Sequence, residues 1–319
     1  MVKMTVLASG SRGNSTVVSS TRTRILVDAG VSCRELFKRM QAAGEDPRTL
    51  DAILITHEHQ DHVQGLAVTA RKLGIPVYFT EATHRAWIRW VTPRKRMTYA
   101  EWLAERKQQA ESRAAAAASP EPANSDSNER EAFEEEQETL AADDAKAKPD
   151  PASLPMVEYF TAGQGFSVGD IAVTPFTIPH DAADPVGFVF EAEGVRIGLA
   201  TDLGYIPANA AMRLRRCDVL MLESNHDLDM LRDGPYPWSV KQRVMSRVGH
   251  LSNNATAEFL AKGYDGQAEY VILAHLSESN NLPELARVSA EHALRDRMSL
   301  LGNRVLLATQ DEPMTSILL

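Results

Sequence analysis

Short apolar runs separated by glycine, proline and polar turns recur along most of this chain. Runs of about four to eight apolar residues rich in β-branched side chains predict strands, and longer stretches with one apolar side predict helices. The predicted strands are residues 2–8, 16–28, 52–55, 75–79, 157–160, 170–178, 186–193, 195–200, 218–222, 269–274 and 304–308. The predicted helices are residues 32–43, 65–73, 81–90, 99–112, 238–248, 254–262 and 283–296. Strands followed by helices, twice over, fit an α/β fold in which two sheets pack together with helices outside, an αββα sandwich.

One segment, residues 108–155, departs from this pattern. It begins with an alanine run at 114–118 and is then dominated by Ser, Pro, Asn, Asp and Glu. Such a composition buries too little apolar area to offset the entropy lost on ordering. We therefore expect a disordered acidic insertion within a single domain that spans residues 1–319. A solvated spacer is the preferred interpretation, and an arm that mimics nucleic acid or contacts an unknown protein partner is the alternative.

Charge is unevenly distributed along the chain. The net charge is −9, but residues 108–150 alone contain twelve acidic and four basic residues, so the remainder is close to neutral. The acidic balance therefore does not exclude a nucleic-acid substrate. The apolar runs are too short for a membrane span, and the N-terminus is typical of a first strand rather than a signal peptide. The only two cysteines, Cys33 and Cys217, suit a reducing compartment. We expect a cytoplasmic protein, whose oligomeric state the sequence does not indicate.

Metal-ligand side chains are concentrated directly after the predicted strand 52–55. His57, His59, Asp61 and His62 fall within six positions. On a tight loop, two of these histidines can face one metal ion while the aspartate and the last histidine face a second. Two divalent ions about 3.5–4 Å apart can activate a shared hydroxide and stabilise both oxygens of a displacement. The spacing does not fit the helical histidine pair of an H-E-x-x-H protease. A merely structural role for four such residues is much less common.

The pattern H-x-H-x-D-H resembles the signature of the metallo-β-lactamase superfamily. The redox-active flavodiiron branch of that superfamily carries an acidic residue at the second histidine position. Here that position is His59, so the resemblance implies hydrolysis rather than redox chemistry.

Three further candidate ligands each follow a predicted buried strand. They are His180, Asp202 and His275. Taken singly, each would more often be a structural histidine or a turn aspartate, but their order matches the superfamily. Carried over residue by residue, the resemblance implies His57, His59 and His180 for one ion, Asp61, His62 and His275 for the other, and Asp202 as a bridge. Such ligands accept Zn, Mn or Fe, so we expect two divalent ions per chain, with Zn or Mn preferred.

His250 competes with His275 for the last ligand position. It precedes a predicted helix that Ser252 or Asn253 could cap. In the tRNA 3′-processing ribonucleases of the superfamily, a Gly-His-Ser-Thr segment before a helix supplies a proton donor, and Gly249-His-Leu-Ser resembles it. We therefore assign His250 as general acid, with metal ligation as the alternative. His250 and Asp61 are the predicted catalytic residues.

Five more residues are candidates around this centre. Asp28 ends a predicted strand and could hydrogen-bond a ligand histidine, although a simple strand-ending turn is an equal alternative. Ser9, Arg12 and Asn14 belong to a polar loop that could offer N–H groups and a guanidinium to a phosphate. His226 follows the predicted strand 218–222, and we expect it to line the pocket.

Several segments together resemble the bacterial WalJ/YycJ-type proteins. They are Ser-Gly-Ser-Arg-Gly-Asn-Ser at 9–15, Pro-His-Asp-Ala-Ala-Asp-Pro-Val-Gly-Phe at 179–188, Glu-Ser-Asn-His-Asp at 223–227, Gly-His-Leu-Ser-Asn at 249–253 and His-Leu-Ser-Glu-Ser-Asn-Asn at 275–281. The resemblance covers residues 3–107 and 156–318. It implies a metal-dependent phosphodiesterase with nuclease activity, including 5′→3′ DNA exonuclease action, on DNA, RNA or another phosphodiester. The alternatives are a lactone, thioester, small-ester or cyclic-phosphodiester hydrolase of the same fold and, in a different class, a regulatory binding module.

Overall fold

The computed structural model describes residues 1–92, 103, 106–107, 150–295 and 303–319. Contacts divide the chain into two units, one formed by Met1–Val91 with Pro151–Leu319 and the other by Thr92–Asp150. The predicted helix at 99–112 and the predicted disorder of the acidic insertion fall almost entirely outside the described residues. The architecture below is that of the first unit.

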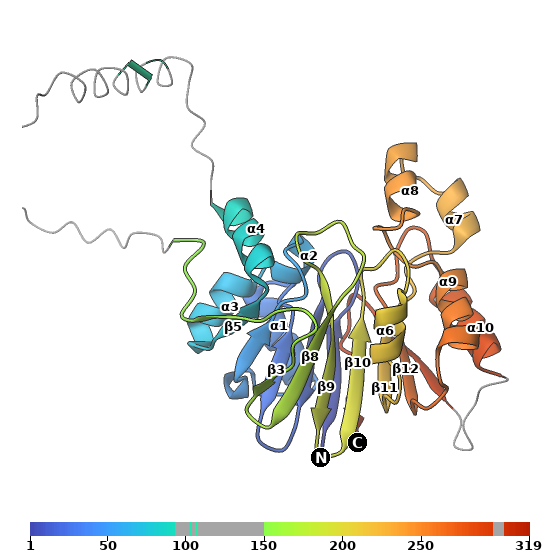
Figure 1. Cartoon of the computed structure of the whole chain (residues 1–319), viewed down its shortest axis with the longest axis horizontal. Coiled ribbons are helices and arrows are strands. Elements are labelled where there is room, and N and C mark those ends of the chain that lie inside the picture. The colour runs from blue at the N-terminus through green and yellow to red at the C-terminus, as the bar shows by residue number, and fades with distance from the viewer. Residues whose placement is uncertain (93–102, 104–105, 108–149, 296–302) are drawn as a thin grey trace, which may run out of the picture. The chain divides into compact units, whose positions relative to one another are not determined.

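Two seven-stranded sheets pack face to face in this unit, with helices on their outer faces (Figure 1). The first sheet has the order β14 (Ile317–Leu318), β1 (Lys3–Ala8), β2 (Ser15–Ser19), β3 (Arg24–Val27), β4 (Ala52–Leu54), β5 (Val77–Phe79) and β6 (Val157–Tyr159). The second has the order β13 (Arg304–Leu307), β12 (Tyr270–Ala274), β11 (Val219–Glu223), β10 (Val195–Ala200), β9 (Val186–Ala192), β8 (Ile171–Thr177) and β7 (Phe166–Val168). The predicted αββα sandwich is confirmed.

Each sheet is antiparallel in one half and parallel in the other. Strands β3 to β6 run parallel in the first sheet, and β10 to β13 run parallel in the second. The carboxyl ends of parallel strands lie at one edge, where open α/β sheets usually place ligands. This topology brings loops from distant parts of the sequence together.

Three layers of buried side chains hold the sandwich. Along β11, Val219 and Met221 face the core between the sheets, whereas Leu220 and Leu222 face the core under the helices. Because successive side chains of a strand point to opposite faces, a strand covered on both sides is apolar at every position. This is why the buried strands appeared as short uninterrupted apolar runs.

Helices cover both outer faces. On the first sheet lie α1 (Cys33–Ala42), α3 (Leu66–Leu73) and α4 (Glu81–Val91), and on the second lie α6 (Ala208–Arg213), α9 (Asn253–Glu258) and α10 (Pro283–Leu294). Three further helices stand at the edge of the sandwich, namely α2 (Gln60–Val63), α7 (Leu228–Asp233) and α8 (Trp238–Val244). A 3-10 turn spans Pro47–Thr49, and a π-helical turn, Phe259–Gly263, continues α9. No helix in the described part of the chain is long and apolar enough to cross a membrane.

The structure differs from the sequence predictions mainly in short elements. The predicted strand 16–28 is a hairpin of β2 and β3, because the polar turn Ser20–Thr23 reverses the chain. The predicted helix 238–248 ends at Val244, whose carbonyl accepts a hydrogen bond from the His250 N–H at 2.9 Å as the chain folds back. The elements β7, β14, α6 and α7 were not predicted, since two to six residues carry too little periodicity.

Candidate metal centre

The predicted ligands converge at the carboxyl-terminal edge of the strands. The histidine motif follows β4, His180 follows β8, Asp202 follows β10 and His275 follows β12. Asp202 and His275 have φ angles of 61° and 55°, and Asp28 after β3 has 59°. This left-handed conformation is uncommon for residues other than glycine and costs about 1–3 kcal/mol. It bends the chain sharply at each strand end.

One group of ligand atoms consists of three imidazoles. Ligand atoms of His57, His59 and His180 all lie within 4.8 Å of one another. His180 Nε2 is 3.2 Å from His59 Nδ1, and His180 Nδ1 is 3.2 Å from the carbonyl oxygen of Gly249. A proton donated to that carbonyl leaves Nε2 with a free lone pair, as a metal ligand requires.

A second group combines carboxylates and imidazoles. His62 Nε2 lies 3.4 Å from Asp61 Oδ2 and 3.3 Å from Asp202 Oδ2. His275 Nε2 lies 3.7 Å from Asp61 Oδ2. Asp202 also groups with His57 of the first set, so its carboxylate lies between the two groups. The structure therefore brings all seven predicted ligands together.

The buried atoms of this cluster fit metal binding. Among the described residues, His57 Nε2, Asp202 Oδ2 and His275 Nε2 are buried and make no hydrogen bond. Buried polar atoms normally have a partner, so three unpartnered lone pairs in one cluster point to a cation. Imidazole and carboxylate donors are those that zinc and other divalent transition metals accept.

Asp28 orients one of these histidines. His62 Nδ1 donates to Asp28 Oδ2 at 2.8 Å, and the backbone N–H of Thr56 donates to Asp28 Oδ1 at 2.9 Å. Burial raises the pKa of Asp28, and the neighbouring His62 opposes the rise. A buried carboxylate behind a ligand histidine fixes the ring so that its other nitrogen faces the metal.

The first loop contacts the ligands directly. Asn14 Nδ2 lies 3.1 Å from both Asp61 Oδ2 and His62 Nε2. The Ser9 hydroxyl accepts a hydrogen bond from the His275 backbone N–H at 2.8 Å. Asn14 and Ser9 thus hold the predicted metal ligands Asp61, His62 and His275 in place. Arg12 instead is exposed and pairs with Glu278 and Asp311.

Glu223 was not predicted, although it is central to the arrangement. It is fully buried at the end of β11, and its Oε1 accepts hydrogen bonds from His250 Nδ1 and His275 Nδ1, both at 2.8 Å. Its Oε2 accepts from the backbone N–H groups of Leu203 and Leu251. Burial alone would raise the pKa of Glu223, but His250 and the other donors lower it to about 2. The sequence signal that could have identified Glu223 is an acidic residue directly after a predicted apolar strand.

His250 and His226 differ in their access to this centre. The His250 ring is 5.1 Å from that of His180 and 5.0 Å from that of His275, and its side chain is 19% exposed, compared with 4% for His275. Burial lowers the pKa of His250, but Glu223 more than reverses this, so the pKa is raised. Ligand atoms of His250 lie within 4.8 Å of those of Asp202, Glu223 and His275, so the position of His250 also suits its alternative role as a metal ligand. His226 is buried, belongs to none of the ligand groups found among the described residues, and has a pKa lowered to about 4 by burial.

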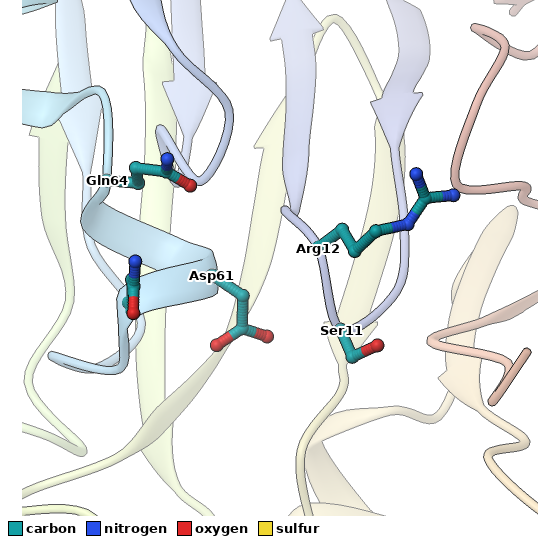
Figure 2. Close-up of a pocket in the computed structure, with 5 residues that line it drawn as sticks. Ser11, Arg12, Asp61 and Gln64 are labelled. Atoms are coloured by element: carbon teal, nitrogen blue, oxygen red, sulfur yellow. The ribbon is translucent and has the colours of Figure 1, made fainter.

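A cavity of about 410 Å³ opens beside the centre, lined by Ser11, Arg12, Gln60, Asp61 and Gln64. Figure 2 shows the Asp61 carboxylate projecting from α2 toward Ser11, with the Arg12 guanidinium turned away from it. The lining is polar, as a site for a charged or hydroxylated substrate requires.

Comparison with known proteins places this architecture in a family. A family model described as the metallo-beta-lactamase superfamily matches residues 8–237. The chain is 31% identical over 292 residues to exodeoxyribonuclease WalJ of Streptococcus pneumoniae serotype 2 (strain D39 / NCTC 7466), covering 92% of this chain and 88% of the relative. It is 31% identical over 294 residues to exodeoxyribonuclease YycJ of Bacillus anthracis, covering 92% and 89%.

The solved structure of the metallo-beta-lactamase fold protein YhfI from Bacillus subtilis is similar in fold. It aligns with a TM-score of 0.60 over 98% of this chain and 99% of that one, at 14% sequence identity. The chain therefore belongs to the metallo-beta-lactamase superfamily. Within it, the chain is a metal-dependent hydrolase of the WalJ/YycJ branch, and the resemblance seen in the sequence is confirmed.

Proposed function

We propose that this protein is an exodeoxyribonuclease that hydrolyses DNA phosphodiester bonds at a centre of two divalent metal ions. The observation that carries the proposal is that two groups of possible ligands share the Asp202 carboxylate, and that His57 links one of them to His59 and His180. One group consists of His57, His62 and Asp202, and the other of Asp202, Glu223, His250 and His275. The names of the relatives that share 31% of its residues support DNA as the substrate.

The proposed ligand sets are those that the sequence resemblance implies. One ion would be held by His57, His59 and His180, the other by Asp61, His62 and His275, with Asp202 shared. Divalent ions in such a centre activate water as a nucleophile and neutralise the charge that develops on phosphoryl oxygens. Zn or Mn would suit these ligands best, and Fe is the alternative.

The chain's own groups supply orientation and a proton. His250 would donate a proton to the leaving oxygen, and Glu223 would keep the ring in place through the 2.8 Å hydrogen bond to Nδ1. Because Nδ1 is committed to Glu223, Nε2 is the atom available to the substrate. Asp28 and Asn14 would hold His62 and Asp61 in position throughout.

The test is a substrate panel with defined metals. The purified protein, loaded with Mn²⁺ or Zn²⁺, is assayed on end-labelled single- and double-stranded DNA, RNA, a lactone and bis(p-nitrophenyl) phosphate, and its metal content is measured. We expect stepwise shortening of DNA and two metal ions per chain. His62→Ala should abolish cleavage and lower the metal content, whereas His292→Ala, at an exposed position on α10, should change neither. Hydrolysis of the lactone alone would replace DNA by a small ester as the substrate, and full activity of His62→Ala would overturn the two-metal centre.

A further inference from the structure

A surface beside the metal centre exposes aromatic and apolar side chains. We call it the α8 surface, and it consists of Tyr205, Trp238, Val240, Met245 and Val248. Trp238 is 61% exposed, although tryptophan is normally well buried. Single exposed apolar residues need no explanation, but four of these five fall within residues 238–248, and such a concentration indicates a binding site.

The same segment is locally basic. Residues 234–250 contain Lys241, Arg243 and Arg247 and no acidic residue, in a chain with 43 acidic and 34 basic residues overall. Lys241 is buried and donates to the carbonyl oxygens of Arg232 and Gly234, so it ties α8 to α7. Arg243 and Arg247 remain exposed. Because Arg243 forms an ion pair with Asp181, Arg247 is the arginine of this segment whose charge remains available.

One of these arginines lies on an aromatic ring. The Arg247 guanidinium carbon is 4.5 Å from the centroid of the Tyr205 ring. Arg247 forms no ion pair with a carboxylate among the described residues. A guanidinium stacked on tyrosine is held flat and can contact a base or a phosphate with its free edge.

Hydrogen bonds connect the α8 surface to the metal ligands. Arg243 Nε lies 2.5 Å from Asp181 Oδ2, and the Asp181 N–H donates to the carbonyl oxygen of Val248. Asp181 directly follows His180, whose Nδ1 faces the carbonyl oxygen of Gly249. Figure 1 places α8 at the same end of the sandwich as α2, which carries Asp61 and His62. A strand that crosses α8 would therefore be led toward the centre.

We propose that the α8 surface binds the single-stranded part of the DNA substrate, with Trp238 stacking on a base and Arg247 contacting a phosphate. This inference rests on the proposed nuclease function and extends it to the recognition of the strand. Aromatic side chains beside arginines are how proteins hold single strands without sequence preference. A second copy of the chain fits less well, because a two-fold interface pairs the same patch on both subunits and would bring two surfaces that carry arginine and no acidic residue together.

The experiment measures binding separately from cleavage. The metal-loaded protein is titrated into a 3′-labelled phosphorothioate oligo(dT) of about 15 nucleotides, a length within the usual site size for single strands, and anisotropy is recorded at several salt concentrations. Trp238→Ala should weaken binding about tenfold, and Trp238→Phe should restore most of it. Arg247→Ala should lower the slope of log K against log salt by about one.

Matched variants serve as controls. Trp90→Ala removes an exposed tryptophan from α4, and Arg232→Ala removes an arginine that pairs with Asp229 and Asp233 on α7. Both should bind as wild type. Thermal melting of each variant shows whether it is folded.

The outcomes separate the two proposals. If wild type binds the oligonucleotide more tightly than the α8-surface variants but cleaves no DNA, the proposed DNA-binding role of the α8 surface is supported and the proposed nuclease function is wrong. If wild type cleaves DNA while the folded Trp238 and Arg247 variants bind DNA as tightly as wild type, the proposed DNA-binding role of the α8 surface is wrong and the proposed nuclease function stands. If wild type does not bind the oligonucleotide, the proposed DNA-binding role is also wrong. It is wrong as well if the protein is a dimer that Trp238→Ala dissociates while the affinity for DNA stays the same.

Discussion

Gly30 shows how little room the ligand segments leave around them. Its N–H donates to the carbonyl oxygen of Asn14 at 2.9 Å, and a Cβ built on it would lie 1.7 Å from the carbonyl oxygen of Asp61. Two backbone segments therefore pass where any side chain would stand. Only glycine allows the first loop and the α2 segment to meet at this point.

Replacing this glycine should separate the two segments. We expect Gly30→Ala to lower the free energy of unfolding by about 3 kcal/mol, the upper end for overpacking, and to abolish metal-dependent cleavage because Asp61 must move. Urea unfolding and metal content measure both effects. Gly165→Ala is the control, since its Cβ would make only ordinary contacts, the nearest at 3.6 Å. Retention of full metal content by Gly30→Ala would contradict the geometry described here.

Glu223 decides the orientation of two histidines at once. Its two oxygens accept hydrogen bonds from His250, His275 and two backbone N–H groups, and an amide cannot accept at both ends. Glu223→Gln should therefore reduce metal affinity or turnover by about 10- to 100-fold, as for other carboxylates behind ligand histidines. Turnover on end-labelled DNA and metal affinity are the measurements. Glu258→Gln, at an exposed position paired with Lys262, should match wild type, and equal activity of the two variants would remove Glu223 from this role.

At the scale of elements, strand ends and short helices deliver the site. The ligand loops after β4 and β12 leave strands that are buried on both faces, so their starting points are rigid. Strand β8, before His180, instead alternates buried and exposed side chains. The loop that contains His250 is in turn followed by α9, whose N-cap is Ser252. This helix anchors the far side of the loop, and a weaker cap should therefore affect both stability and catalysis.

The cap offers a direct test. The Ser252 hydroxyl accepts a hydrogen bond from the Ala255 N–H at 3.1 Å. Ser252→Ala should lower the free energy of unfolding by about 1 kcal/mol, measured by urea denaturation. Ser167→Ala, at an exposed position in β7, removes a hydroxyl of no comparable role and should change stability much less. A variant as stable as wild type would show that the cap contributes nothing.

At the scale of the whole molecule, the two-sheet unit contains every residue assigned to the centre. In the sequence, the acidic segment lies between α4 and β6. On the far side of that segment, Ala152 and Leu154 already pack against the core beneath α1, α3 and α4. The two-sheet unit is thus complete on both sides of the insertion.

Removal of the insertion should spare catalysis. A chain in which residues 110–150 are replaced by a short Gly-Ser linker should keep the cleavage rate and metal content of the full chain, because a solvated spacer contributes no ligand. The measurement is cleavage of end-labelled DNA under identical metal loading. A large loss of activity in a folded variant would show that the segment takes part in substrate binding or in the assembly of the centre.

The sequence by itself was sufficient for the sandwich and for seven ligand candidates. A strand buried on both faces must be apolar throughout, so a His directly after such a run, as at His275, stands out without any coordinates. Asp28 was also recognisable at a strand end, although only the structure distinguishes its hydrogen bond to His62 from a simple turn.

The tertiary structure decided which of these residues touch. The contact of Ser9 with His275 and that of Glu223 with two histidines join positions far apart in the chain, and no local pattern encodes such pairs. The left-handed turns at Asp28, Asp202 and His275 are likewise held by surrounding packing against their own preference. Periodicity reports which face of an element is buried, whereas the meeting of loops from separate strands depends on sheet order and register, which arise only when the whole sandwich forms.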